Sequence, residues 1–90
     1  MDEREKKRLR GLGHPLKAVV LIGSAGLTGA VAHEIESALT AHELIKVKVR
    51  VGDRHKRDAT ITEICSSSGA ELIQRIGNTA LLYRQNPAQT

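Results

Sequence analysis

The chain has 90 residues, with 14 Lys and Arg against 10 Asp and Glu, a net charge of +4, and one cysteine. This length allows one domain with one modest core and excludes two domains. Cys65 has no partner for an internal disulfide, so the fold does not depend on an oxidising compartment. Tyr83 is the only aromatic residue, so the core must be built from aliphatic side chains.

The positive charge is concentrated in two parts of the chain. Six basic residues lie between Arg4 and Lys17 and six between Lys46 and Arg57, whereas residues 18–45 contain none. Such clustering favours a polyanionic partner over an evenly solvated surface. No apolar run is long enough to span a membrane, and residues 1–10 lack the apolar core of a signal peptide. We therefore expect a cytoplasmic protein.

The first half of the chain predicts a helix, a strand and a second helix. Residues 2–12 carry acids followed by bases, as suits the dipole of a short helix. Ala18 to Ile22 is a continuous run of apolar, mostly branched residues, which is typical of a buried strand. From Thr28, a plausible N-cap, apolar residues recur at helical spacing as far as about Glu43, and His42 falls on the same face.

The second half begins with alternation typical of a strand. Apolar residues from Ile45 to Val51 alternate with Lys46, Lys48 and Arg50, which predicts one buried face and one basic face. Asp53 can cap a helix that runs to Ser68, although Thr60 offers a second possible start.

The end of the chain predicts a hairpin. Residues 71–76 and 79–84 flank Gly77-Asn78, a pair suited to a tight turn. We assign residues 1–84 to the domain and residues 85–90 to a flexible tail. The whole order, α-β-α-β-α-β-β, predicts a small two-layer α/β domain, because strands joined through a helix are normally parallel with both helices on one face.

Parallel pairing of the first two strands would bring two helix starts to one edge of the sheet. Gly23 to Thr28 leaves the first strand and Gly52 to Arg57 leaves the second. The first N–H groups of each helix favour an anion there, and glycine allows a sugar-phosphate chain to come close to the backbone. The pattern therefore predicts phosphate binding at this edge.

Four motifs together resemble the CRM domain (chloroplast RNA splicing and ribosome maturation), in its stand-alone bacterial YhbY form. They are residues 7–16 (KRLRGLGHPL), 20–28 (VLIGSAGLT), 42–49 (HELIKVKV), and 76–78 (IGN) before 81–84 (LLYR). The resemblance implies a fold similar to the C-terminal domain of translation initiation factor three, with a mixed four-stranded sheet whose last strand is antiparallel. It also implies that the chain binds RNA and associates with precursors of the large ribosomal subunit. The loop from Gly23 to Gly26 is then the expected RNA contact. Many members carry a basic residue inside that loop, whereas this chain has Ser24 and Ala25.

The candidate RNA-binding residues fall into three groups. They are the loop residues Gly23, Ser24, Ala25, Gly26, Leu27 and Thr28; the segment Arg54, His55, Lys56 and Arg57; and the further cations Lys6, Lys7, Arg10, Lys46, Lys48 and Arg50. We expect a monomer with RNA as its partner, and no cofactor, metal, membrane or small-molecule substrate.

Two other binding functions compete with this hypothesis. One is a dinucleotide-binding unit, which is faintly resembled by the strand, the glycines at 23, 26 and 29, the helix and Asp53. The glycine spacing does not match that motif, and the chain is short. A protein-interaction module that uses the acidic helix with Glu34, Glu36 and Glu43 stays open.

An enzyme is the least favoured function. His33-Glu34 lacks the second histidine of a His-Glu-x-x-His zinc motif, because Ser37 occupies that position. Cys65 lies on the inward face of its predicted helix, where a thiol usually packs in the core.

Overall fold

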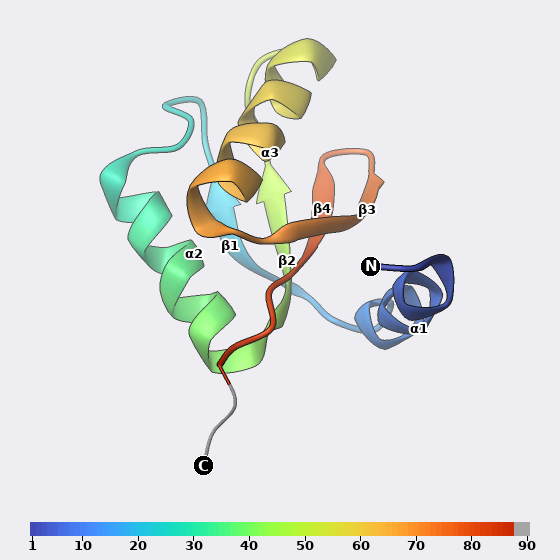
Figure 1. Ribbon diagram of the computed structural model, residues 1–90. Helices are drawn as coiled ribbons and strands as arrows, with labels where there is room; N and C mark the ends of the chain where they lie inside the picture. The colour runs from blue at the N-terminus through green and yellow to red at the C-terminus, as the bar shows by residue number, and fades with distance from the viewer. Residues whose placement is uncertain (88–90) are drawn as a thin grey trace.

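The computed structural model describes residues 1–87 and has the predicted order of elements (Figure 1). They are α1 (Glu3–Gly13), β1 (Ala18–Ile22), α2 (Gly29–His42), β2 (Leu44–Val49), α3 (Arg54–Ser68), β3 (Glu71–Ile76) and β4 (Thr79–Tyr83). Every boundary lies within two residues of the predicted one.

The four strands form one mixed sheet in the order β1-β2-β4-β3. β1 pairs parallel with β2, whereas β4 runs antiparallel to both β2 and β3. The prediction of an antiparallel last strand is therefore confirmed. As a consequence, β1, β2 and β3 all end at the same edge of the sheet.

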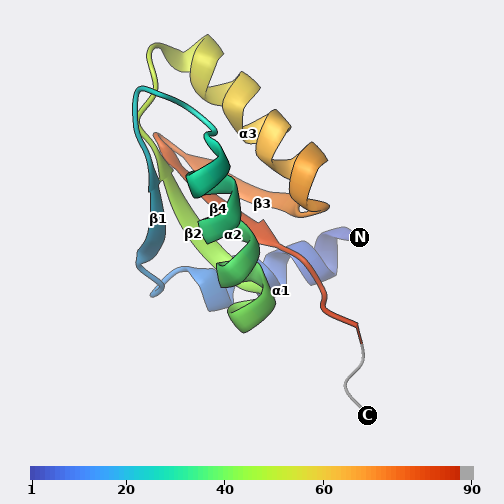
Figure 2. The same ribbon diagram turned by 90° about the vertical axis from the view of Figure 1, so that its left-hand side faces the viewer.

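Helices α2 and α3 cover one face of the sheet, as predicted (Figure 2). The alternation in β2 explains this packing, since Ile45, Val47 and Val49 are buried in the core beneath these helices and the lysines between them face the other way. Ile35 and Leu39 of α2 and Ile61 and Ile64 of α3 complete an aliphatic core. His42, placed by its spacing on the inward face of α2, is exposed instead, because it is the last residue of that helix.

Helix α1 packs on the opposite face of the sheet and adds a partial third layer. Leu9 is buried against Ile73 and Leu81 there. The helix can approach this closely because Gly13 has no side chain: a Cβ at that position would lie 2.5 Å from Leu81 Cδ2. The outer face is thus covered only in part.

Both helices that leave the parallel strands have side-chain N-caps. The Thr28 hydroxyl accepts a hydrogen bond of 3.2 Å from the Val31 N–H, and the Asp53 carboxylate accepts one of 3.0 Å from the Lys56 N–H. Thr60, the alternative cap, instead donates to the Lys56 carbonyl. Residues 54–57 therefore form the first turn of α3.

The described part of the C-terminal segment lies against the end of α2. The Asn86 side chain donates to the Thr40 carbonyl at 2.8 Å, and Arg84 pairs with Glu36 at 2.7 Å. Two of the three acids considered for protein interaction, Glu36 and Glu43, thereby bind the chain's own residues. The rest of the predicted tail, residues 88–90, falls outside the described residues.

Candidate nucleic-acid interface

The ends of the strands place three segments along one edge, which we call the rim: residues 23–28, 52–57 and 77–78. The Arg50 N–H donates to the Ile22 carbonyl at 2.8 Å, and the Val49 N–H donates to the Asn78 carbonyl at 2.7 Å. These bonds tie the end of β2 to the end of β1 on one side and to the β3–β4 turn on the other. Figures 1 and 2 both show the β1–α2 loop and the start of α3 at the same end of the sheet.

The Gly23–Thr28 loop is a compact turn with its backbone exposed. The Gly26 N–H donates to the Gly23 carbonyl at 2.9 Å, and Gly26 has a φ of 75°, which favours glycine. Ser24 and Ala25 are exposed at its tip, and Leu27 packs partly against the core. No atom lies within 4 Å of the position that a Gly23 Cβ would take. The loop therefore offers backbone without a covering side chain.

The first turn of α3 adds positive charge to the rim. Arg54, His55 and Lys56 are exposed, whereas Arg57 is half-buried. The Arg57 Nε is buried and has no hydrogen-bond partner among residues 1–87. Three permanent cations thus occupy one helical turn, next to the positive end of the helix dipole.

Within residues 1–87, these rim cations form no ion pair with the chain's own carboxylates. Asp53 caps α3, and Asp58 pairs with Arg75 at 3.1 Å, so both nearby acids have other partners. On α1, in contrast, Arg10 lies 3.5 Å from Glu3 and Arg8 pairs with Glu5, which lowers the pKa of Glu5 mainly through a hydrogen bond. Among the described residues, the three rim cations are therefore unpaired, whereas on α1 Arg8 and Arg10 are paired and Lys6 and Lys7 are not.

The remaining predicted contacts lie outside the rim, although Arg50 comes just before its 52–57 segment. Lys48 is on the outer face of β2, and Lys6, Lys7 and Arg10 are on α1, which packs against the outer face away from the rim. Lys46 is near the start of β2, where its ammonium group donates to the carbonyls of His14 at 3.1 Å and Leu16 at 3.0 Å. The ammonium of Lys46 thus fastens the α1–β1 connection.

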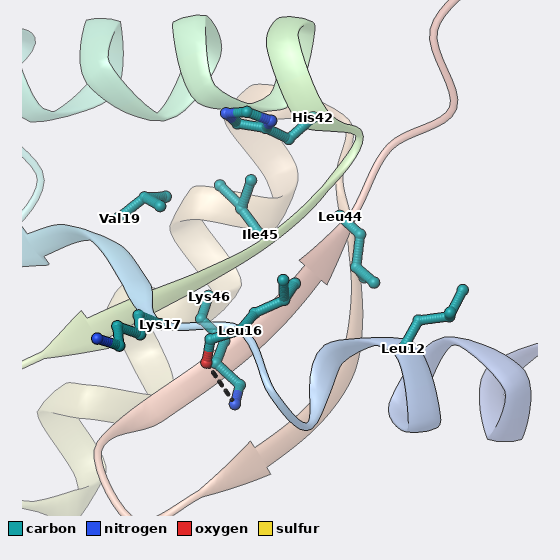
Figure 3. A pocket seen from close by; sticks show the side chains of 8 residues that line it. All are labelled: Leu12, Leu16, Lys17, Val19, His42, Leu44, Ile45 and Lys46. Carbon is teal, nitrogen blue, oxygen red and sulfur yellow. Dashed lines mark hydrogen bonds between the residues drawn. The ribbon is translucent and has the colours of Figure 1, made fainter.

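A hollow of about 440 Å³ adjoins Lys46 at the opposite edge of the sheet from the rim (Figure 3). Its lining is largely apolar and includes Leu12, Leu16, Val19 and Leu44. Because it lies at the starts of β1 and β2, the hollow is separated from the helix starts by the length of these strands.

The sequence interpretation missed a second hollow, of about 240 Å³, on the outer face between the rim and the α1–β1 connection. It is lined by His14, Lys46, Gln74, Ile76, Thr79 and Leu81. The period-two pattern of the hairpin could have placed Gln74, Ile76 and Thr79 on one face. It could not have shown that α1 stops short of covering them.

Chemistry-bearing side chains are sparse elsewhere. Residues 1–87 contain no group of three or more His, Cys, Asp or Glu that could hold a metal ion. Burial, more than the nearby Glu71, raises the pKa of the half-buried Cys65 thiol. In the described part of the chain, no helix combines the length and apolarity needed to cross a bilayer.

Comparison with known proteins gives matches over almost the whole chain. The model of the CRS1/YhbY (CRM) domain family matches residues 1–84. A Pseudomonas aeruginosa protein named as a probable RNA-binding protein is 44% identical over 87 residues, which cover 97% of this chain and 84% of that protein. A Haemophilus influenzae protein named as an RNA-binding protein is 44% identical over 84 residues, covering 93% and 85%.

A solved structure matches the fold as well. The solution structure of a hypothetical protein from Staphylococcus aureus superposes with a TM-score of 0.85 at 26% identity. The match covers 100% of this chain and 94% of that one. These matches confirm the resemblance and the fold predicted from the four sequence motifs.

Proposed function

Because the chain belongs to the CRS1/YhbY (CRM) domain family, we propose that it binds RNA, with the sugar-phosphate backbone seated on the rim. Family membership also confirms the prediction that the chain is not an enzyme. The observation that carries the proposal is the bonding of Arg50 to Ile22, which holds the glycine loop and the basic turn of α3 along one edge.

Each part of the rim has a separate role in this proposal. The Gly23–Gly26 loop lets the backbone approach phosphate closely, since no side chain covers Gly23. Arg54, Lys56 and Arg57 supply charge, and their lack of intramolecular ion pairs within residues 1–87 leaves it for phosphates. Arg50 and Lys48 extend the charge over the rim to the outer face, whereas the cations of α1 and Lys46 make a smaller contribution.

Salt dependence tests this mechanism. With about six phosphates engaged, affinity falls on the order of a thousandfold between about 50 and 200 mM salt, because each contact releases counterions. Fluorescence anisotropy with a labelled RNA measures the slope. A flat dependence contradicts backbone binding, and salt-insensitive binding of a nicotinamide or adenine cofactor without RNA binding favours the dinucleotide alternative.

We further propose that the RNA is ribosomal RNA in precursors of the large subunit, as the family resemblance implies. Sequencing of RNA crosslinked to the protein in cells tests this assignment. Enrichment of large-subunit precursor sequences is expected, and crosslinks spread over unrelated transcripts would count against it.

A further inference from the structure

The outer face of the sheet carries an uncovered row of side chains just below the rim. Leu21 pairs with Lys48, Lys48 with Thr79, and Thr79 with Ile76, so that the row crosses all four strands. Leu21 is 55% exposed and Ile76 is 67% exposed. Helix α1 packs against Leu81 and Ile73 and leaves this row open.

The hollow of about 240 Å³ described above adjoins one end of this row. Ile76 gives it an exposed apolar wall, whereas Leu81, at 2% exposed, adds little accessible surface, and the Gln74 amide and Thr79 hydroxyl give it polar groups. Neither polar side chain forms a hydrogen bond to another residue within 1–87. A flat ligand with polar edges would fit this combination, because the apolar wall contacts one of its faces and the amide and hydroxyl can each donate and accept.

The hollow is continuous with the rim. Ile76 and Thr79 flank the Gly77-Asn78 turn, which is itself part of the rim through the bond from Val49 to Asn78. Lys48 and Arg50 lie between the hollow and the basic turn of α3, and none of the residues that line the hollow is acidic. A phosphate chain seated on the rim could therefore place an adjacent nucleotide over the outer face.

We propose that this hollow receives an unpaired nucleobase of the RNA whose phosphates lie on the rim; this inference rests on the function proposed above. The base lies against Ile76, and its polar edge meets Gln74 and Thr79. A base within a duplex is stacked and paired, so the site selects single-stranded RNA. Apolar contact with the face of a base is open to every base alike, so discrimination among bases is weak.

Two variants and one matched control test the proposal. Ile76→Ser removes an apolar wall, Gln74→Met removes the amide while keeping an unbranched side chain of similar length, and Val19→Ser changes another exposed β-branched residue, on the edge strand at the opposite end of the sheet. Anisotropy is measured with a short single-stranded RNA and with a duplex of the same sequence, and thermal unfolding checks that each variant is folded.

The expected result is selective weakening of single-strand binding. Ile76→Ser lowers affinity for the single strand about fivefold, as loss of a partial apolar contact predicts, and Gln74→Met lowers it by a similar factor. Duplex affinity stays unchanged in both, and Val19→Ser changes neither. Gln74→Met decides the question if Ile76→Ser fails to fold.

Other outcomes overturn the proposal in distinguishable ways. Equal losses for the single strand and the duplex, or no loss for either, show that the hollow takes no base. If neutralising Arg54, Lys56 and Arg57 abolishes binding under the same conditions, the proposed function still stands. If the unmodified chain binds neither RNA, both proposals are wrong.

Discussion

The backbone N–H of Arg50 donates a hydrogen bond of 2.8 Å to the carbonyl of Ile22, across the ends of two parallel strands. This bond fixes where the two following segments begin. The glycine loop after Ile22 and the helix start after Asp53 consequently share one edge of the sheet. Phosphate binding by both segments at once depends on that placement.

Neutralising the basic turn of α3 is expected to weaken binding to all RNA sequences alike. Replacing Arg54, Lys56 and Arg57 together by Gln removes phosphate contacts, and these carry no sequence information. Replacing Arg4, Arg8 and Lys17 by Gln removes the same charge away from the rim and is the control. Anisotropy with several unrelated RNA sequences measures both, and equal losses in the two variants would show a purely general charge effect.

The two glycines of the loop are expected to respond differently to alanine. Gly26 has a φ of 75°, so Gly26→Ala strains the backbone by about 1–2 kcal/mol and lowers the unfolding temperature. Gly23 has no such constraint, and beyond its chain neighbours nothing lies within 4 Å of the position that its Cβ would take. Gly23→Ala therefore keeps the unfolding temperature but weakens RNA binding, because the new methyl group holds phosphate away. Unchanged RNA affinity in Gly23→Ala would show that the loop is only a turn.

Alanine substitutions at two glycines of α1, two positions apart, are expected to have opposite effects on stability. Gly11 is open to solvent, so Gly11→Ala stabilises the helix by about 0.5–1 kcal/mol. In Gly13→Ala the new Cβ meets Leu81 at 2.5 Å, which costs about 1–3 kcal/mol of overpacking. Urea unfolding measures both. Similar shifts in the two variants would contradict the close packing of α1 on β4.

Cys65 is expected to react slowly in the folded chain. Burial raises the pKa of its thiol above the ordinary value of 9.0, so less thiolate is present at a given pH. Because the folded-state pKa is the higher of the two, the protonated thiol stabilises the fold fully at pH values below the unfolded-state pKa. This contribution to stability is lost as the pH rises through the folded-state pKa. Iodoacetamide labelling at pH 8, with and without denaturant, checks the reactivity. Equal rates would show that the thiol is not protected.

Local patterns predicted most of the fold. The alternation of Lys46 and Lys48 with valines fixed the two faces of β2, and the aspartate at position 53 marked the start of α3. The choice between Asp53 and Thr60 needed the structure, because both are good caps and only the observed hydrogen bonds separate them.

Long-range packing could not be predicted from those patterns. Nothing local in α1 indicates that Gly13 would meet Leu81, or that Lys46 would bond to the carbonyls of His14 and Leu16. The anchoring of Asn86 on α2 likewise joins residues more than 40 positions apart. The RNA roles of the candidate residues stay predictions until binding is measured.

The most direct test of the shared rim is an amide chemical-shift titration of the isotope-labelled chain with a short single-stranded RNA. We predict that amides of residues 23–28 and 54–57 shift together with one midpoint. Shifts confined to one of these segments, or gathered around Val19, His42 and Leu44 at the opposite edge, would contradict the account.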